Sequence, residues 1–439
     1  MIETIIMIAQ IILSLSILVG LHELGHLIAA KFFGMRVEQY SIGFPPKIFG
    51  VKYGETVYSI GAIPLGGFVK ISGMIDESLD TEKMKEEPIE WEFRAKPAWQ
   101  RLIGMMGGII INVILGIIIF IGLQYYFGET YVTKEETNKY GIYAMGLGKE
   151  LGLKTGDRII KVNGQDYEKF SDIMGPEVTL GSSSYYTVDR DGEIFDISIP
   201  SDFIERLNSE GKDDGFITIL QPYEVGKVLK GSAAQAAGLK SGDQILEVNG
   251  QPAVYFQLLR EVIVENKGKE ISLKVLQDGE TKSLTAQVNQ EGLIGFRPNS
   301  LLETQRIQYT FIEAVKSGTK EAFQVTVFNI RGLGKIIRGE VGRKSVKSVI
   351  GIAEYFGGNW DWQRFWFLTG MLSMWLAFLN FLPIPALDGG HVMFLSYEII
   401  SGRKPSDKFL EGAQKVGMAF LLVLMVFLIG NDIINAISD

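Results

Sequence analysis

Three histidines occur in the chain of 439 residues, and two of them, His22 and His26, flank Glu23 in the sequence HELGH. Residues four apart share one face of a helix, so both imidazoles can reach one metal ion beside Glu23. The surrounding stretch is apolar, where ionisable groups are unfavourable unless they face a cavity or bind a ligand. The pattern predicts one Zn²⁺, or another divalent ion, per chain, with Glu23 as general base.

A catalytic zinc site takes three protein ligands, and the chain has no cysteine to supply the third. The remaining intramembrane candidate is Asp388, in the sequence NFLPIPALDGGH. Pro383 and Pro385 break the preceding helix, and the glycines after Asp388 let the backbone bend toward a metal. We therefore predict Asp388 as the third ligand. An N-cap for a short helix over residues 391–400 is an alternative role that can coexist with it.

Four apolar stretches have the length of about 20 residues that crosses a hydrocarbon core. They are residues 5–30, 102–127, 365–382 and 416–434. Lys and Arg gather in residues 31–101 and before the last stretch, and neither terminal tail carries one. By the positive-inside rule, both termini and the long segment 128–364 lie outside the cytoplasm. The net charge of −8 is dispersed, which argues against a nucleic-acid partner.

The segment between the second and third stretches contains a repeat. GLKTGDRIIKVNGQ at residues 152–165 recurs as GLKSGDQILEVNGQ at residues 238–251, with ten of 14 positions identical. The offset of 86 residues is that of one small domain. Each copy has a Gly-Asp turn, an alternating strand and an Asn-Gly hairpin signal, and resembles the PDZ domain. Such domains can bind C-terminal peptides at a sheet edge, or can act here only as steric bulk.

Residues 306–345 follow the second copy and mix apolar and basic residues at helical spacing. This pattern predicts an amphipathic helix on the outer membrane face. A helix packed against the two PDZ copies is the alternative interpretation.

Together, HELGH in the first stretch and NFLPIPALDGG after the third resemble the site-2 protease family, peptidase family M50. The two PDZ copies and the phrase IGAIPLGGFVKISG resemble its bacterial RseP-type branch, and the likeness covers nearly the whole chain. It implies His22, His26 and Asp388 as zinc ligands and Glu23 as general base.

The resemblance also implies that Asn380 holds the substrate or stabilises the developing oxyanion, and that His391 is not a zinc ligand but a supporting residue. Residues 56–71 resemble the family's membrane-dipping β-hairpin, whose strand edge can pair with an unwound substrate.

We therefore predict a membrane α-helical core of about four transmembrane helices, a membrane-associated β-hairpin, and two β-rich PDZ domains between helices two and three. The predicted boundaries are 1–127 for the first two helices with the hairpin, 128–217 and 218–305 for the PDZ domains, 306–364 for the amphipathic segment and 365–439 for the last two helices.

The predicted function is regulated intramembrane proteolysis in the bacterial inner membrane. By resemblance, the substrates are single-span membrane proteins, such as truncated anti-sigma factors and remnant signal peptides. A silent receptor that tethers peptides and a zinc transporter are the rival interpretations. The intact HELGH with Asp388 argues against the first, and the gathering of polar groups in one place argues against the second.

Overall fold

The computed structural model describes residues 2–74, 87–209, 215–339 and 349–438. The chain forms two compact units. Unit 1 comprises Met1–Gly128, Gln308–Gly334 and Gly342–Asp439, and unit 2 comprises Glu129–Ile307 and Lys335–Val341. The predicted amphipathic segment 306–364 includes residues 340–348, which lie outside the described part of the chain.

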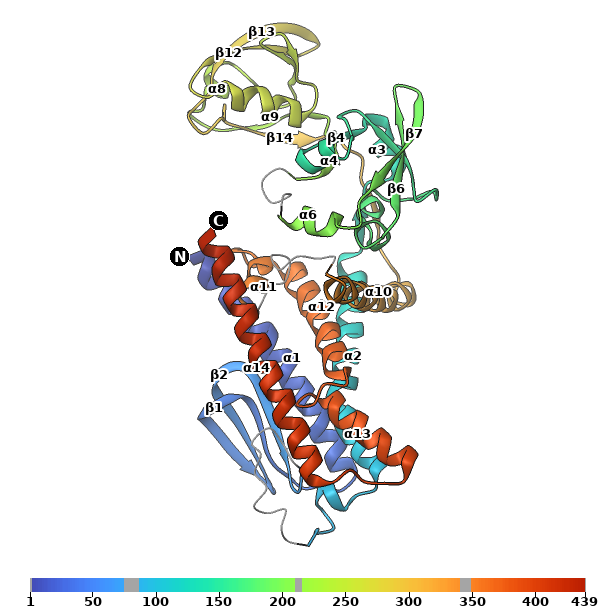
Figure 1. Ribbon diagram of the computed structural model, residues 1–439. Helices are drawn as coiled ribbons and strands as arrows, with labels where there is room; N and C mark the ends of the chain where they lie inside the picture. Colours follow the sequence, from blue (N-terminus) through green and yellow to red (C-terminus); the bar gives the residue numbers. More distant parts are fainter. Residues whose placement is uncertain (1, 75–86, 210–214, 340–348, 439) are drawn as a thin grey trace. The chain divides into compact units, whose positions relative to one another are not determined.

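Unit 1 is a helical bundle with one β-hairpin (Figure 1), in which α2 packs against α1, α12 and α13. Three helices in the described part are long and apolar enough to cross a membrane: α1, α2 and the Asp407–Asp432 part of α14. The helices of unit 1 are α1 (Ile2–Phe32), α2 (Ala98–Phe127), α10 (Phe311–Ile337), α11 (Val349–Phe356), α12 (Trp362–Phe381), α13 (Asp388–Ser401) and α14 (Asp407–Ser438).

The third predicted span corresponds to α12, which has 20 residues and packs beside α1 and α2. Arg364, Asn380 and three tryptophans lower its mean hydropathy, and it is not among the described helices that are apolar enough to cross a membrane. Its length of about 30 Å matches a hydrocarbon core, and a fourth crossing stays a prediction.

The hairpin consists of β1 (Val37–Tyr53) and β2 (Thr56–Ile71), joined by a turn at Gly54 and Glu55. Both strands bend, so residues 39–42 of β1 lie opposite residues 57–60 of β2 and also opposite its residues 67–70. The hairpin is therefore longer than the residues 56–71 expected from the sequence. The final part of β2 lies at an edge, with a strand partner on one side only among the described residues.

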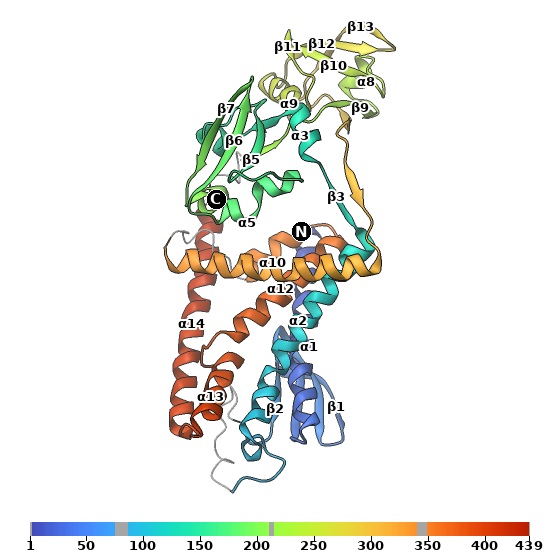
Figure 2. The same ribbon diagram turned by 90° about the vertical axis from the view of Figure 1, so that its right-hand side faces the viewer.

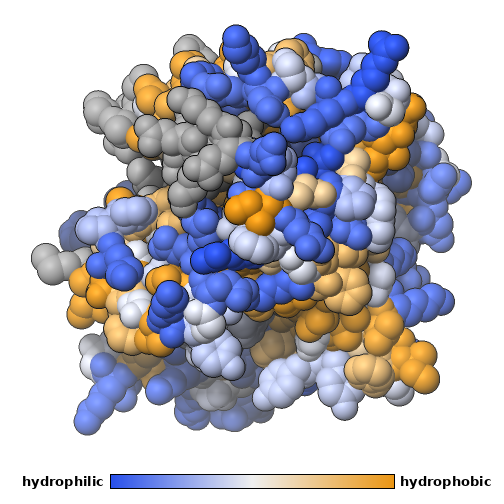
Figure 3. Space-filling view, turned by 90° about the horizontal axis from the view of Figure 1, so that it is seen from below, coloured by the Kyte–Doolittle hydropathy of each residue, from blue (hydrophilic) through white to orange (hydrophobic). Residues whose placement is uncertain are grey.

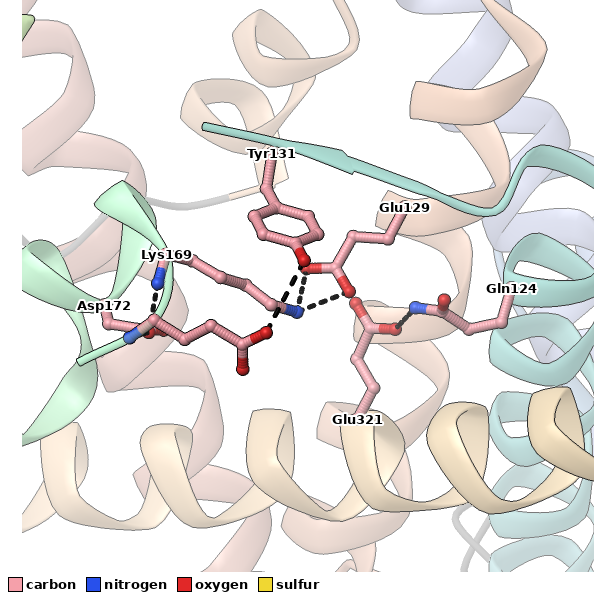
Figure 4. A network of polar contacts seen from close by, with 7 residues as sticks. Gln124, Glu129, Tyr131, Lys169, Asp172 and Glu321 are labelled. Carbon is pink, nitrogen blue, oxygen red and sulfur yellow. Dashed lines mark hydrogen bonds and ion pairs between the residues drawn. The ribbon is translucent and has the colours of Figure 1, made fainter. Parts of the chain in front are cut away.

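Helix α10 lies across the end of α2 (Figure 2). Their backbones meet at Gly318, where an added Cβ would stand 2.5 Å from the nitrogen of Ile121. Beside this contact, the Gln124 amide donates to Glu321 at 2.5 Å (Figure 4). A second face of α10 exposes large apolar side chains: Phe311, Ile312, Val315, Phe323, Val327 and Ile330.

Unit 2 contains two hydrophobic cores, one drawn from residues 142–216 and one from residues 223–294. The first surrounds the sheet β5–β6–β7 (Arg158–Val162, Ser184–Arg190, Glu193–Ile199), with β4 (Ile142–Ala144) paired to β8 (Ile217–Ile219). The second surrounds the sheet β11–β10–β12–β13 (Gln251–Pro252, Gln244–Val248, Glu270–Gln277, Glu280–Gln287), with β9 (Tyr223–Val228) paired to β14 (Phe296–Ser300). The helices include α3 (Lys134–Tyr140), α4 (Gly146–Glu150), α6 (Phe203–Ser209), α8 (Ala233–Ala236) and α9 (Phe256–Glu265).

The sequence repeat has the same local structure in both cores. Asn163 and Asn249 both have φ of 51°, a left-handed conformation that asparagine tolerates. Each side-chain oxygen accepts a backbone N–H at 2.9 Å, from Tyr185 in the first copy and from Ser272 in the second. The two copies therefore build equivalent hairpins, and their assignment to the PDZ fold stays a prediction.

Side-chain contacts within unit 2 join the two copies to each other and to the strand that leads in from α2. The Tyr143 hydroxyl of the first copy donates to Glu261 of the second at 2.5 Å. Burial and the Glu261 carboxylate raise the pKa of Tyr143 to about 12, so this phenol stays a donor at neutral pH. Lys169 pairs with Glu129 on β3 (Glu129–Tyr131) at 2.6 Å (Figure 4).

The two ends of the chain lie at the same end of unit 1, and the link from α13 to α14 lies at the opposite end (Figure 1). Hydrophilic residues cover much of the face seen from below, and hydrophobic residues gather at parts of its rim (Figure 3). A polar end next to apolar helices is the arrangement expected where a bundle leaves a membrane.

Candidate metal centre

The donor atoms of His22, His26 and Asp388 converge near the middle of unit 1. His22 Nε2 lies 3.0 Å from Asp388 Oδ2, and His26 Nε2 lies 3.3 Å from both of these atoms. Three ligands bound tetrahedrally to zinc at about 2.0–2.1 Å would stand roughly 3.3–3.4 Å apart, close to these separations. Three converging lone pairs repel one another unless a cation or protons lie between them, so the donor set fits a metal ion.

The local fold of α1 explains how two of these side chains meet. His22 and His26 are one helical turn apart, and both are 6% exposed. The α1 backbone approaches α2 closely at Gly25, where an added Cβ would stand 2.2 Å from the Gly107 oxygen. Next to it, a Cβ on Gly108 would stand 2.5 Å from ring atoms of both histidines. Glycines on α2 therefore leave the space that the two imidazoles occupy.

Asp388 reaches the histidines because α12 ends at Phe381 and the chain turns through Pro383 and Pro385 before α13 begins. Asp388 is the first residue of α13, and Leu387 takes the N-cap position without a side-chain cap bond. The alternative expectation of a cap for a helix starting at residue 391 is wrong, because the helix starts at Asp388 itself and the carboxylate faces His22 and His26.

A cavity of about 430 Å³ opens beside the donor atoms. Glu23, His26 and Asp388 line it on one side. The edge part of β2, residues 67–71, lines it on another, and a Cβ on Gly67 would stand 3.3 Å from Glu23 Cγ. The cavity therefore brings together the Glu23 carboxylate, two of the three candidate metal ligands and a strand edge.

The other two residues named from the sequence lie on either side of this site. The Asn380 amide nitrogen is 3.3 Å from His22 Nε2, so the amide faces the donor atoms. His391 lines the cavity, and its ring contacts Gln414 of α14 at 2.9 Å. Among the described residues, the group of converging donors consists of His22, His26 and Asp388, and the supporting role of His391 stays a prediction.

Asn112 was not among the site residues expected from the sequence. Its side chain is completely buried, and its amide nitrogen lies 3.1 Å from His22 Nδ1. A lone polar residue at the centre of a spanning helix was the available signal, because such residues are unfavourable in lipid without a partner.

The family model of peptidase family M50 matches residues 10–424 of this chain. The chain belongs to peptidase family M50. It is 28% identical to a regulator of sigma E protease from Haemophilus influenzae, over 97% of this chain and 98% of that protein. It is 29% identical to the regulator of sigma-E protease RseP from Salmonella typhimurium, over 97% of both chains.

A third relative, the zinc metalloprotease RasP from Geobacillus kaustophilus, is 27% identical over 99% of both chains. Membership of the family and full-length likeness to zinc metalloproteases make this chain a metalloendopeptidase of the site-2 type, which cuts within membranes. The tethering-receptor and zinc-transporter interpretations are therefore set aside.

Proposed function

We propose that His22 Nε2, His26 Nε2 and Asp388 Oδ2 hold one zinc ion per chain, and that the fourth position is left for the reaction. The convergence of these atoms within 3.3 Å beside the cavity carries this proposal. Three protein ligands are typical of catalytic zinc, whereas structural sites take four. When bound, zinc would polarise the scissile carbonyl and make water a nucleophile at neutral pH.

Glu23 and Asn380 act on the substrate and on water in this proposal. Glu23 lines the cavity next to the candidate ligands, where its carboxylate can accept a proton from the attacking water and return it to the leaving amine. Asn380 presents its amide 3.3 Å from His22 Nε2, close enough to donate to the developing oxyanion.

The edge part of β2 binds the substrate in an extended form. A helix hides its peptide bonds in its own hydrogen bonds, so a transmembrane substrate must unwind before it is cut. Residues 67–71 have β1 on one side and the cavity on the other, so an unwound segment can add as a further strand. Pairing there would bring the substrate's backbone alongside Glu23.

The substrates are single-span membrane proteins, such as truncated anti-sigma factors and remnant signal peptides, and the setting is the bacterial inner membrane. Two relatives are proteases that are named as regulators of sigma E, and these names support this substrate class. The termini and unit 2 lie outside the cytoplasm, supported by the distribution of Lys and Arg. The two PDZ copies either bind C-terminal peptides or exclude bulky proteins.

Replacement of Glu23 by Gln tests the proposal. We expect cleavage of a single-span substrate in proteoliposomes to fall by about 10²- to 10⁴-fold, because the general base is lost. Zinc content should stay at one ion per chain, because Glu23 is not a ligand. Glu55→Gln, in the exposed turn of the hairpin, is the matched control and should cleave at the wild-type rate. Undiminished cleavage by Glu23→Gln would contradict the proposed role.

A further inference from the structure

Asn112 lies on α2 behind the candidate metal ligands and away from the cavity side. Its side chain is completely buried, and its backbone oxygen accepts a hydrogen bond of 2.7 Å from the Ser373 hydroxyl of α12. Its amide group faces Nδ1 of His22 at 3.1 Å, the ring nitrogen opposite the one that faces Asp388. Asn112 therefore touches a candidate ligand without touching the space for substrate.

The chemistry of imidazole determines what Asn112 must offer. A neutral histidine that gives its Nε2 lone pair to a metal carries its proton on Nδ1, so Nδ1–H of His22 needs an acceptor. In the orientation described, the amide nitrogen faces this N–H, and Asn112 Oδ1 is buried without a hydrogen-bond partner among the described residues. A half-turn about the Cβ–Cγ bond exchanges the two amide atoms, gives Nδ1–H its acceptor and gives Oδ1 a partner.

His26 has the same arrangement one helical turn further along α1. Its Nδ1 lies 2.9 Å from the backbone oxygen of Gly104, also on α2, while its Nε2 faces Asp388. Gly104 and Asn112 are about two turns apart on α2. The same helix thus supplies an acceptor for each histidine, a backbone oxygen for His26 and a side-chain amide for His22.

We propose that Asn112 is a positioning residue for the metal centre. It accepts a hydrogen bond from Nδ1–H of His22 and fixes the ring so that Nε2 faces the metal. The same hydrogen bond strengthens the Nε2 lone pair as a metal ligand. This inference rests on the proposed zinc site. Acceptors of this kind typically change metal affinity by about 10- to 100-fold when they are removed.

Two variants of similar size test whether Asn112 positions the His22 ring or only fills space. Asn112→Asp keeps an acceptor, and Asn112→Leu removes it. We expect zinc affinity of the purified chain, measured by competition with a chelator, to stay within about threefold of wild type in the Asp variant and to fall by about 10- to 100-fold in the Leu variant. A residue that only fills space would give the reverse order, because Leu is apolar and Asp buries a charge. The reverse order, or equal affinities in wild type and both variants, would overturn the proposal.

A second measurement uses the wild-type chain, so it does not depend on whether a variant folds. With only three histidines, ¹⁵N-labelled imidazoles of the zinc-loaded wild-type chain can be resolved by NMR. We expect His22 to carry its proton on Nδ1, and a proton on Nε2 would overturn the proposal.

Asp388→Ala, measured by the same chelator competition, distinguishes a failure of the zinc site from a failure of the role of Asn112. Zinc binding that is lost in Asp388→Ala but unchanged in Asn112→Leu would contradict only the role of Asn112. Unchanged zinc binding in Asp388→Ala would contradict the zinc site itself.

Discussion

At the scale of residues, the candidate metal centre depends on small side chains as well as on its candidate ligands. The two imidazoles occupy space that Gly108 leaves open on α2, because a Cβ there would stand 2.5 Å from His22 Cε1 and from His26 Nε2. Real Cβ atoms do not approach other atoms so closely, so one ring must move if Gly108 gains a methyl group. Two of the candidate ligands lie in HELGH, but the space for their rings depends on Gly108, 82 positions after His26.

Replacement of Gly108 by Ala should therefore lower zinc affinity by at least about tenfold, because small displacements at a metal site are felt strongly. The measurement is chelator competition on the purified chain. Gly122, on the same helix, has open space around its Cβ position, so Gly122→Ala is the matched control and should bind zinc as wild type does. Equal affinities in the two variants would show that the imidazoles do not need this space.

At the scale of elements, α10 presents two different faces. One packs on α2 through Gly318 and Ala322, and another exposes Phe323, at 51%, and Val327. Exposed aromatic and aliphatic side chains beside Lys316 and Lys320 are typical of a helix that lies in the membrane interface. The membrane-surface placement of this segment therefore stays a prediction, and a helix packed against the two PDZ copies stays its alternative.

Spin labels can test this interpretation, because the chain has no cysteine and a single introduced cysteine takes one label. A label at Phe323→Cys in a reconstituted chain should be reached better by oxygen, which concentrates in lipid, than by a water-soluble nickel complex. The control is Gln324→Cys, exposed on a different face of α10, which should show the opposite preference. The same preference at both positions would contradict an interfacial helix.

At the scale of the whole molecule, the sequence predicted the long helices better than it predicted their packing. The four apolar stretches correspond to α1, α2, α12 and α14, because long apolar runs specify helices in lipid almost regardless of context. The hairpin was underestimated, because its strands bend and β1 pairs with two parts of β2, which local patterns do not reveal. Asn112 and Gly108 were missed because their roles depend on contacts with α1, distant in sequence.

We propose that one zinc ion joins the two ends of the chain, held by His22 and His26 from α1 and by Asp388 from α13. Metal analysis of the purified wild-type and Asp388→Ala chains tests it most directly. We expect about one zinc per wild-type chain and a large loss in the variant, because a carboxylate ligand is removed. Equal zinc content in both chains, each folded, would contradict the account.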